Sequence, residues 1–280
     1  PPLAATRDDP YSLEELIPAT AKALEAQVLF IAENPNPVGR KGDMERAPGD
    51  SAYVKGHAEH HPWLAKLARR LMLDDLMLVN KQGDVVYSVV KETDFGRSVE
   101  NGPLAGTPFG QLVRRIMQSR QPGEVRLSDF AFYWPSQNKP AAFMAAPIYK
   151  DGVFVGTIVA QISIEAIGAL VNDNGKWREQ GLGSSGSVYI VGSDLFMRSN
   201  FRNMMENPKG FVDSILRQNL VTPGVGARML AQNTTVLYYP IRNAPLAKAF
   251  QGRSDTEHFV NQRGVGAYLS YAPLDIPDLT

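Results

Sequence analysis

Two predicted β-hairpins on either side of one amphipathic helix constrain the fold of this chain more than any other feature. The first hairpin covers residues 76–90 and turns at Gly83, where glycine tolerates positive φ. Residues 107–119 carry apolar side chains at helical spacing, and the second hairpin covers residues 141–164 after a short aromatic strand at 125–134. A doubly wound parallel sheet needs a helix after every strand, so the order predicts an α+β fold with an antiparallel sheet.

The segment before these hairpins is predicted to be helical. Ser12 and Glu15 form a capping-box pattern, and apolar residues continue at helical spacing to residue 32. A connector rich in proline, glycine and charge covers residues 34–50, and a second amphipathic helix is predicted over 62–73. Residues 1–73 are therefore expected to form an N-terminal helical stalk and connector.

Short sequence patterns from the first half of the chain recur in the second half. Residues 143–148 are similar to 268–274, and a turn pattern at 78–84 returns in shorter form at 190–194. A repeat of this length is the size of a domain. We predict two modules, residues 74–164 and 165–280, with the last strand missing from the second. Predicted helices cover residues 164–172 and 208–220, and predicted strands cover 187–191, 196–199, 234–239, 257–262 and 266–272.

Composition excludes several classes of function. Lys and Arg total 29, as do Asp and Glu, so no basic surplus is available for phosphate backbones and a nucleic-acid partner is not expected. The absence of cysteine removes thiolate nucleophiles and cysteine-type zinc sites. The apolar stretches are too short to span a bilayer, so we expect any membrane anchor to lie outside these 280 residues.

Motifs in both halves carry a resemblance to one family. They are Lys91-Glu92-Thr93-Asp94-Phe95-Gly96, Asp129-Phe130, Tyr133, Pro135-Ser136, Pro140-Ala141-Ala142-Phe143, Ala146-Pro147-Ile148-Tyr149, Gly152, Val155-Gly156-Thr157, Gln161, Gly181-Leu182-Gly183, Tyr189-Ile190-Val191-Gly192-Ser193-Asp194, Met197-Arg198-Ser199 and Arg202. In combination they resemble double-Cache sensor domains, which consist of two tandem PAS-like modules.

This resemblance implies an architecture and a location. A long N-terminal helix would rise from one transmembrane span, residues 74–164 would form a membrane-distal module, and residues 165–280 a membrane-proximal module that returns to a second span. Such sensors belong to methyl-accepting chemotaxis receptors, nucleotide cyclases and histidine kinases. The apolar stripe of the N-terminal helix exceeds what a lone surface helix needs, and we expect it to form a homodimer contact.

The distal module is the predicted site for a small-molecule ligand. Its aromatic segment at residues 130–134 offers apolar rings with polar ends, which suits a pocket that must both hold and orient a ligand. Alternate residues of the same segment are equally suited to pack a core. The candidate ligand-binding residues are Asp94, Phe95, Tyr133, Trp134, Ser136, Asn138, Phe143 and Gln161.

One departure from the family bears on the ligand. Amino-acid-binding members carry an arginine just before an aromatic residue on the third strand, where it binds the ligand carboxylate. Residues 130–134 contain no arginine, and Arg126 is the nearest. The resemblance therefore does not extend to an amino-acid ligand here, whereas Asp94 offers a contact for a cationic one or a cap for a turn.

Three motifs with possible chemistry are better explained without it. Residues 181–186 spell G-x-G-x-x-G, but a strand follows them where a dinucleotide site needs a helix. His57, His60 and His61 have near-metal spacing, although a polar surface at a helix start is favoured. Asp74 and Asp75 fit a turn at the start of a strand rather than an acid–base pair.

No catalytic, metal or cofactor site is therefore predicted. Only His258 lies outside the histidine cluster and no nucleophile elbow occurs, so a serine triad has little support. Arg198 and Arg202 fit either an anion site or surface ion pairs with nearby acids. The expected function is ligand sensing for a bacterial transmembrane receptor, most simply a chemotaxis receptor, with a cyclase or kinase sensor as the alternative. A free periplasmic solute-binding protein is less favoured, because it would show alternating β-α units.

Overall fold

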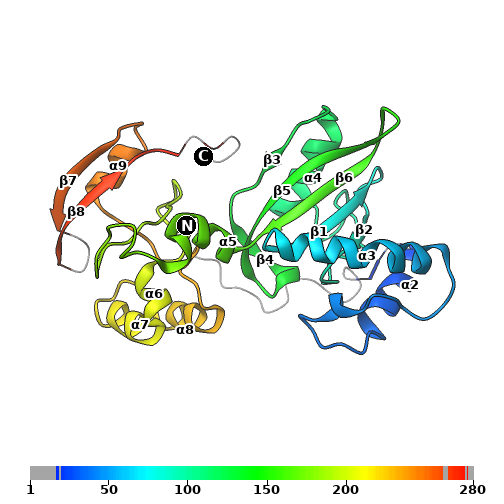
Figure 1. The fold of residues 1–280 in the computed structure, drawn as a ribbon, viewed down its shortest axis with the longest axis horizontal. Coiled ribbons are helices and arrows are strands. Elements are labelled where there is room, and N and C mark those ends of the chain that lie inside the picture. Colours follow the sequence, from blue (N-terminus) through cyan, green and yellow to red (C-terminus); the bar gives the residue numbers. More distant parts are fainter. Residues whose placement is uncertain (1–16, 19, 261–263, 275, 277–280) are drawn as a thin grey trace. The chain divides into compact units, whose positions relative to one another are not determined.

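The structure is a computed structural model that describes residues 17–276 except 19, 261–263 and 275. The chain divides into two compact units, Pro1–Ser163 and Ile164–Thr280 (Figure 1). Both units combine helices with antiparallel strands, so the predicted α+β class is confirmed.

The first unit is built on one antiparallel sheet with strand order β2-β1-β6-β5-β3, and β4 pairs with β5 outside this path. The strands are β1 (Leu73–Asn80), β2 (Val85–Ser88), β3 (Arg126–Leu127), β4 (Ala131–Tyr133), β5 (Lys139–Lys150) and β6 (Val153–Ile162). Both predicted hairpins are present. The strand predicted at 125–134 is divided into β3 and β4, and a 3-10 turn, η3 (Trp134–Ser136), follows.

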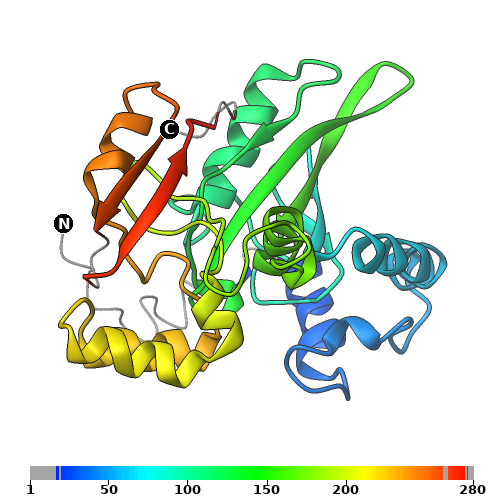
Figure 2. The ribbon, with the colours of Figure 1, turned by 60° about the vertical axis from the view of Figure 1, so that its left-hand side comes forward.

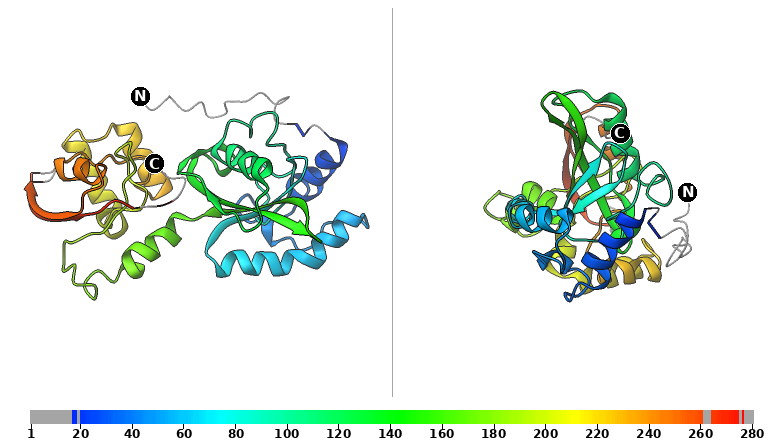
Figure 3. Two further views of the ribbon diagram at one scale, coloured as in Figure 1. Left: turned by 90° about the horizontal axis from the view of Figure 1, so that it is seen from above. Right: turned by 90° about the vertical axis from the view of Figure 1, so that its right-hand side faces the viewer.

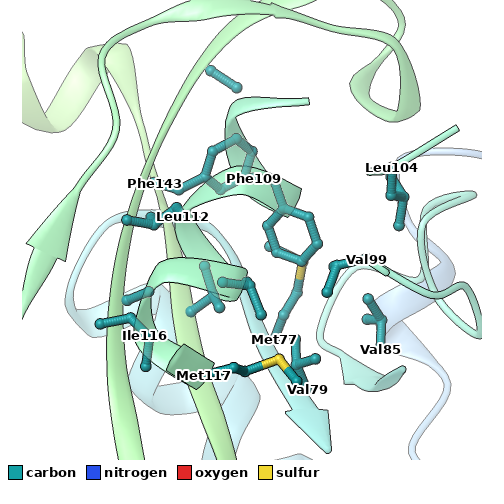
Figure 4. Packing of buried hydrophobic residues seen from close by; sticks show 14 of the residues in the cluster. Met77, Val79, Val85, Val99, Leu104, Phe109, Leu112, Ile116, Met117 and Phe143 are labelled. Atoms are coloured by element: carbon teal, nitrogen blue, oxygen red, sulfur yellow. The ribbon is translucent and has the colours of Figure 1, made fainter. Parts of the chain in front are cut away.

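Helix α4 (Pro108–Ser119) covers one face of this sheet. It begins where the predicted helix does, because the Thr107 hydroxyl accepts a hydrogen bond from the Gly110 N–H at 3.0 Å and caps the first turn. Phe109, Leu112 and Ile116 point from α4 toward the sheet, where they meet Met77 and Phe143 among other buried side chains (Figure 4). This cluster is the main hydrophobic core of the unit.

Gly110 is required by a close approach inside α4. A Cβ atom at this position would lie 2.1 Å from the Leu104 carbonyl oxygen. We therefore expect Gly110→Ala to lower the free energy of unfolding by about 1–3 kcal/mol, as overpacking does in other cores. Chemical denaturation measures the change. Gly106→Ala is the matched control, because no atom lies within 4 Å of its added Cβ; equal stabilities for the two variants would contradict the packing.

Helix α3 (Ala52–Arg70) covers the opposite face of the sheet (Figure 3). The prediction placed its start at residue 62 and was wrong, because Ser51 caps a helix that continues through Pro62. Proline costs a helix one backbone hydrogen bond, but buried side chains on both sides of it, such as Val54 and Leu64, hold the helix against the rest of the unit.

The N-terminal segment consists of α2 (Ala21–Gln27) and one π-helical turn, η1 (Val28–Ala32). The start predicted for this helix, at Ser12, lies outside the described residues, and the described helix begins after the Thr20 cap. Phe30 is fully buried and packs with Val54 of α3 and with Phe95. The segment is therefore fixed to the first unit through its last turn.

The second unit differs more from the prediction. It contains α5 (Ile164–Asn172), η4 (Asp173–Gly175), α6 (Arg202–Glu206), α7 (Pro208–Arg217), α8 (Pro223–Gln232), α9 (Ala244–Ala249), β7 (Asp255–Val260) and β8 (Gly266–Tyr271). Strands β7 and β8 form close to the positions predicted for strands and pair with each other, and α9 lies beside them (Figure 2). The strands predicted at 187–191, 196–199 and 234–239 do not form; only isolated bridges join Val191 to Met197 and Phe196 to Pro240.

Candidate functional site

The loop that follows β2 brings acidic side chains into the interior of the first unit. This β2 loop, residues 89–98, makes two turns and returns to its own strand: the Val85 N–H donates to Arg97 O at 2.8 Å and the Gly96 N–H donates to Val85 O at 2.9 Å. Asp94 is 1% exposed although it lies in a loop. The fold therefore buries a group that would otherwise remain in water.

Asp94 and Tyr133 form the centre of the candidate site. The Tyr133 hydroxyl donates to Asp94 Oδ2 at 2.8 Å, and both side chains are buried. The Tyr133 ring packs edge-on against Phe143, with centroids 4.9 Å apart, and so joins the core while its hydroxyl faces the loop. The other carboxylate oxygen, Asp94 Oδ1, is buried and has no hydrogen-bond partner among the described residues. An unsatisfied buried acceptor costs free energy unless a ligand donates to it.

A second chain of polar groups lies beside this pair. The Ser136 hydroxyl, in η3, donates to Glu92 Oε2 at 2.5 Å, and Gln161 Nε2, near the end of β6, donates to Ser136 Oγ at 3.2 Å. Residues 25 to 44 positions apart in sequence thus meet in one network. Together, Glu92, Asp94, Tyr133, Ser136 and Gln161 define what we call the acidic cluster.

The acidic cluster contains two buried carboxyl groups, those of Glu92 and Asp94, and their surroundings favour the protonated form of each. Burial and, to a smaller extent, the nearby Asp94 carboxylate together raise the pKa of Glu92 to about 8. Burial also raises the pKa of Asp94, although the Tyr133 hydroxyl, the backbone N–H groups of Asp94 and Phe95, and the Arg97 guanidinium oppose the shift. A bound cation would relieve this repulsion, whereas a bound anion would add to it.

The proton held by Glu92 predicts a pH-dependent stability. Because the folded-state pKa of about 8 exceeds the ordinary value of 4.5, the contribution of Glu92 to stability is present below about pH 4.5 and is lost as the pH rises through about 8. Glu92→Gln should therefore gain stability relative to the wild type over this range, by about 1–3 kcal/mol after allowance for solvent screening. Urea denaturation at several pH values measures the difference, and a difference that does not change with pH would refute the buried protonated carboxyl.

The remaining predicted site residues do not join the acidic cluster. Phe143 is fully buried in the main core, and Phe95 points away from Asp94 toward Phe30. Trp134 is half-buried against the core, with the Arg97 guanidinium 5.7 Å from its ring centroid. Asn138 is half-buried and has a φ of 55°. The ligand-binding role of all eight predicted residues stays a prediction.

Sequence reasoning missed Glu92 as a site residue. It occurs in the motif Lys91-Glu92-Thr93-Asp94, and a run of charged residues after a strand is ordinarily a solvated turn. The sequence did contain one indication that Glu92 is buried. The charged run is flanked by the apolar residues Val89 and Phe95, and both are buried. Asp75 was missed for the same reason. It was expected in a turn, but it is 1% exposed and fully enclosed by β1, β2 and the β2 loop.

The histidine cluster is divided between the interior and the surface. His57 and His61 are buried and stack with ring centroids 4.4 Å apart, whereas His60 is exposed. The expected polar surface was therefore wrong for two of the three residues. His61 bonds Tyr87 Oη at 2.8 Å and Gly42 O at 2.7 Å, and burial lowers the pKa of His57 to about 3. Among the described residues, no group of three potential ligands could hold a metal ion.

Arg198 and Arg202 of the second unit both bind groups of the protein itself. Arg198 pairs with Asp194 at 3.0 Å. Arg202 pairs with Glu206 at 2.9 Å, donates to Gly186 O at 2.8 Å, and lies 4.5 Å from the Trp177 ring centroid. Of the two interpretations left open by the sequence, ion pairing fits this geometry, although both arginines are buried rather than on the surface.

A groove of about 640 Å³ is lined in part by the β2 loop. Its lining includes Ala23 and Ala26 of α2, Tyr53 of α3, and Phe95 and Gly96 of the loop. None of the residues that line the groove belongs to the acidic cluster. Within the described part of the chain, the structure contains no helix with the length and apolarity needed to cross a bilayer.

Comparisons with known proteins give structural neighbours only. No family model matches the chain, and no curated protein matches it. Solved structures that match include the sensor domain of the V. cholerae histidine kinase DctB (15% identity, 62% of this chain, 57% of that chain, TM-score 0.35). They also include the sensory domain of the Campylobacter jejuni chemoreceptor Tlp3 (14% identity, 51% of each chain, TM-score 0.35). A third is the ligand-binding domain of the Pseudomonas fluorescens chemoreceptor CtaA with L-leucine (13% identity, 64% of this chain, 60% of that chain, TM-score 0.33).

These neighbours are the sensor domain of a histidine kinase and the sensory or ligand-binding domains of chemoreceptors. The matched region spans little more than half of the V. cholerae chain. At these TM-scores the neighbours do not define a ligand, a partner or an output for this chain.

Proposed function

We propose that this chain is the extracytoplasmic ligand-sensing part of a bacterial transmembrane receptor, and that its first unit binds a small molecule at the acidic cluster. One observation carries the ligand site: Asp94 Oδ1 is buried without a hydrogen-bond partner among the described residues, while the Tyr133 hydroxyl holds Asp94 Oδ2 at 2.8 Å. The carboxylate is therefore positioned before any ligand arrives, and such preorganisation lowers the cost of binding.

The charge of the acidic cluster favours a ligand with a cationic N–H donor. An ammonium or guanidinium group would donate to Asp94 Oδ1. Its positive charge would also lower the repulsion between the carboxyl groups of Asp94 and Glu92, which contributes to the raised pKa of Glu92. Ser136 and Gln161 supply further polar atoms for a neutral part of the molecule. No bond is made or broken in this proposal; binding shifts a population between two states of the sensor.

The receptor context is also proposed rather than established. The first unit would be the membrane-distal module, and the N-terminal helix would form the homodimer contact, since Leu24 and Val28 are partly exposed one helical turn apart. A chemotaxis receptor is the favoured whole protein, with a kinase or cyclase sensor as the alternative. If the gene encodes a second hydrophobic span and then a long helix with heptad repeats, this would support the assignment to a chemotaxis receptor.

A thermal-shift screen tests the proposed ligand class. Small primary amines, guanidines and their neutral amide analogues are added to the purified chain, and a compound that binds only the folded state raises the melting temperature by mass action. We expect stabilising compounds among the cations and not among their neutral analogues. Stabilisation by carboxylates or phosphates alone would contradict the proposal.

A further inference from the structure

Lys91, in the β2 loop, has a buried amine and is not part of the acidic cluster. Its side chain is 2% exposed, and its φ of 59° lies in the left-handed region that few non-glycine residues adopt. The amine donates to the Ser88 carbonyl oxygen, and it lies 4.5 Å from the Tyr87 ring centroid, 5.5 Å from that of Phe95 and 5.7 Å from that of Phe30. A protonated amine is attracted to aromatic faces at these distances.

The three rings come from three different parts of the unit. Tyr87 belongs to β2, Phe95 to the β2 loop and Phe30 to the last turn of the N-terminal segment. The loop and this segment also meet directly, because Gln27 Nε2 donates to Phe95 O at 2.6 Å. At Gly96 the contact is so close that a Cβ would lie 3.2 Å from the Ala23 carbonyl oxygen. Lys91 is therefore at the junction between the loop that carries Asp94 and the N-terminal helix.

Asp75 of β1 links the same junction to the sheet. Asp75 Oδ2 accepts from the Ser88 hydroxyl at 2.6 Å, and Asp75 Oδ1 accepts from the backbone N–H groups of Val89 at 2.9 Å and Val90 at 3.2 Å. Ser88 therefore contacts both side chains, because its hydroxyl donates to Asp75 and its carbonyl oxygen accepts from the Lys91 amine. A change of charge at either side chain acts on the same short stretch of backbone.

We propose that Lys91 is a positioning residue whose protonation holds the β2 loop against the N-terminal helical segment, so that this contact loosens when the amine becomes neutral. The inference concerns the loop and the helix alone and does not require Asp94 to bind a ligand.

The position of the transition follows from the surroundings of the amine. Burial lowers the pKa of Lys91 to about 7, and the Asp75 carboxylate opposes the shift, while burial raises the pKa of Asp75 to about 7. Below this range Lys91 is charged and attracted to the three rings; above it the attraction is lost. The other titratable or charged groups around the pair are His57, His61, Arg69 and Tyr53 of α3, Tyr87 of β2, Glu45, and Glu92, Asp94 and Arg97 of the loop.

Neither buried histidine accounts for a transition near neutral pH. Burial and the nearby Lys91 lower the pKa of both His57 and His61, that of His57 to about 3. His57 is therefore neutral across the range in which Lys91 changes charge, and the pKa of His61 lies below its ordinary value of 6.5. Glu92 titrates close to this range, so its effect must be separated by the choice of variant.

Amide hydrogen exchange of the ligand-free protein tests the proposal. Protection factors, corrected for intrinsic exchange, are measured at about pH 6 and about pH 8.5 for the amides of residues 28–33 and 95–97. We expect protection of these amides to fall roughly ten-fold at the higher pH in the wild type. The amides of α4, on the other face of the sheet, should show no comparable change, which separates local loosening from global unfolding.

Two substitutions identify the amine as the cause. Lys91→Met keeps a long side chain that never carries charge. Because Asp75 titrates in the same range, the comparison is made in an Asp75→Asn background, where Lys91 should keep the step and Lys91→Met should have the same protection factors at both pH values. Lys91→Arg keeps the charge throughout and should stay protected at the higher pH, while Glu92→Gln should retain the wild-type step. A wild type without the step, or a step that persists in folded Lys91→Met in the Asp75→Asn background, would overturn the proposal. If Lys91→Met does not fold, a step that persists in Lys91→Arg would overturn it equally.

Discussion

Replacing Asp75 by alanine is expected to lower the free energy of unfolding by about 2–4 kcal/mol at about pH 5.5. The carboxyl accepts hydrogen bonds from the Ser88 hydroxyl and from the backbone N–H groups of Leu76, Val89 and Val90. Alanine leaves the Ser88 hydroxyl and the Val90 N–H without this acceptor, whereas the Val89 N–H keeps Leu76 O at 3.1 Å.

The pH dependence of this effect distinguishes it from a simple packing loss. Burial, with a smaller contribution from Asp94, raises the pKa of Asp75 to about 7 from 3.8. Its contribution to stability is therefore present below about pH 3.8 and is lost as the pH rises through about 7. The cost of Asp75→Ala should shrink over this range. Urea denaturation measures it, with Asp75→Asn as the control that retains one acceptor and loses less; equal costs for both variants at every pH would contradict the account.

Replacing Asp94 by asparagine should affect binding and stability in opposite directions. Asparagine has the same shape, can accept from the Tyr133 hydroxyl, and has no charge to bury, so the ligand-free variant should melt at the same temperature as the wild type or higher. A cationic ligand would lose its charged partner, and we expect at least a ten-fold loss of affinity, since hydrogen bonds to charged groups contribute about 1.5–3 kcal/mol.

Tyr133→Phe is the companion variant for this site. It leaves the ring between Phe109 and Phe143 and removes only the hydroxyl that orients the carboxylate. We expect weaker binding with a smaller loss than in Asp94→Asn. A marked fall in the melting temperature of Asp94→Asn without ligand would show instead that the carboxylate serves the fold.

The parts of the fold that local rules determine could be predicted from the sequence. Thr107 and the apolar spacing after it define α4, and glycine turns define both hairpins of the first unit. Helix α3 was placed too late because Pro62 is ordinarily read as a helix start. In the second unit, residues 234–239 have the composition of a strand, but Leu237 adopts a φ of 60° and Tyr238 N–H donates to Thr235 O, so the segment turns.

The candidate site was only partly accessible to the same reasoning. Asp94, Tyr133, Ser136 and Gln161 were named from the family resemblance and from aromatic density, and the structure brings them together. Phe95 was grouped with Asp94 because the two are adjacent, yet adjacent side chains in this turn point to different clusters. The burial of Asp75, Lys91 and Glu92 depends on contacts with residues far away in the sequence, which no local pattern specifies.

Isothermal titration calorimetry of the wild type and Asp94→Asn with the most stabilising amine or guanidine from the thermal-shift screen tests the central claim most directly. The predicted result is a saturable heat for the wild type, at least a ten-fold weaker affinity for Asp94→Asn at the same pH, and an unchanged or higher melting temperature for the ligand-free variant. Equal affinities for the two proteins would contradict a ligand site at Asp94.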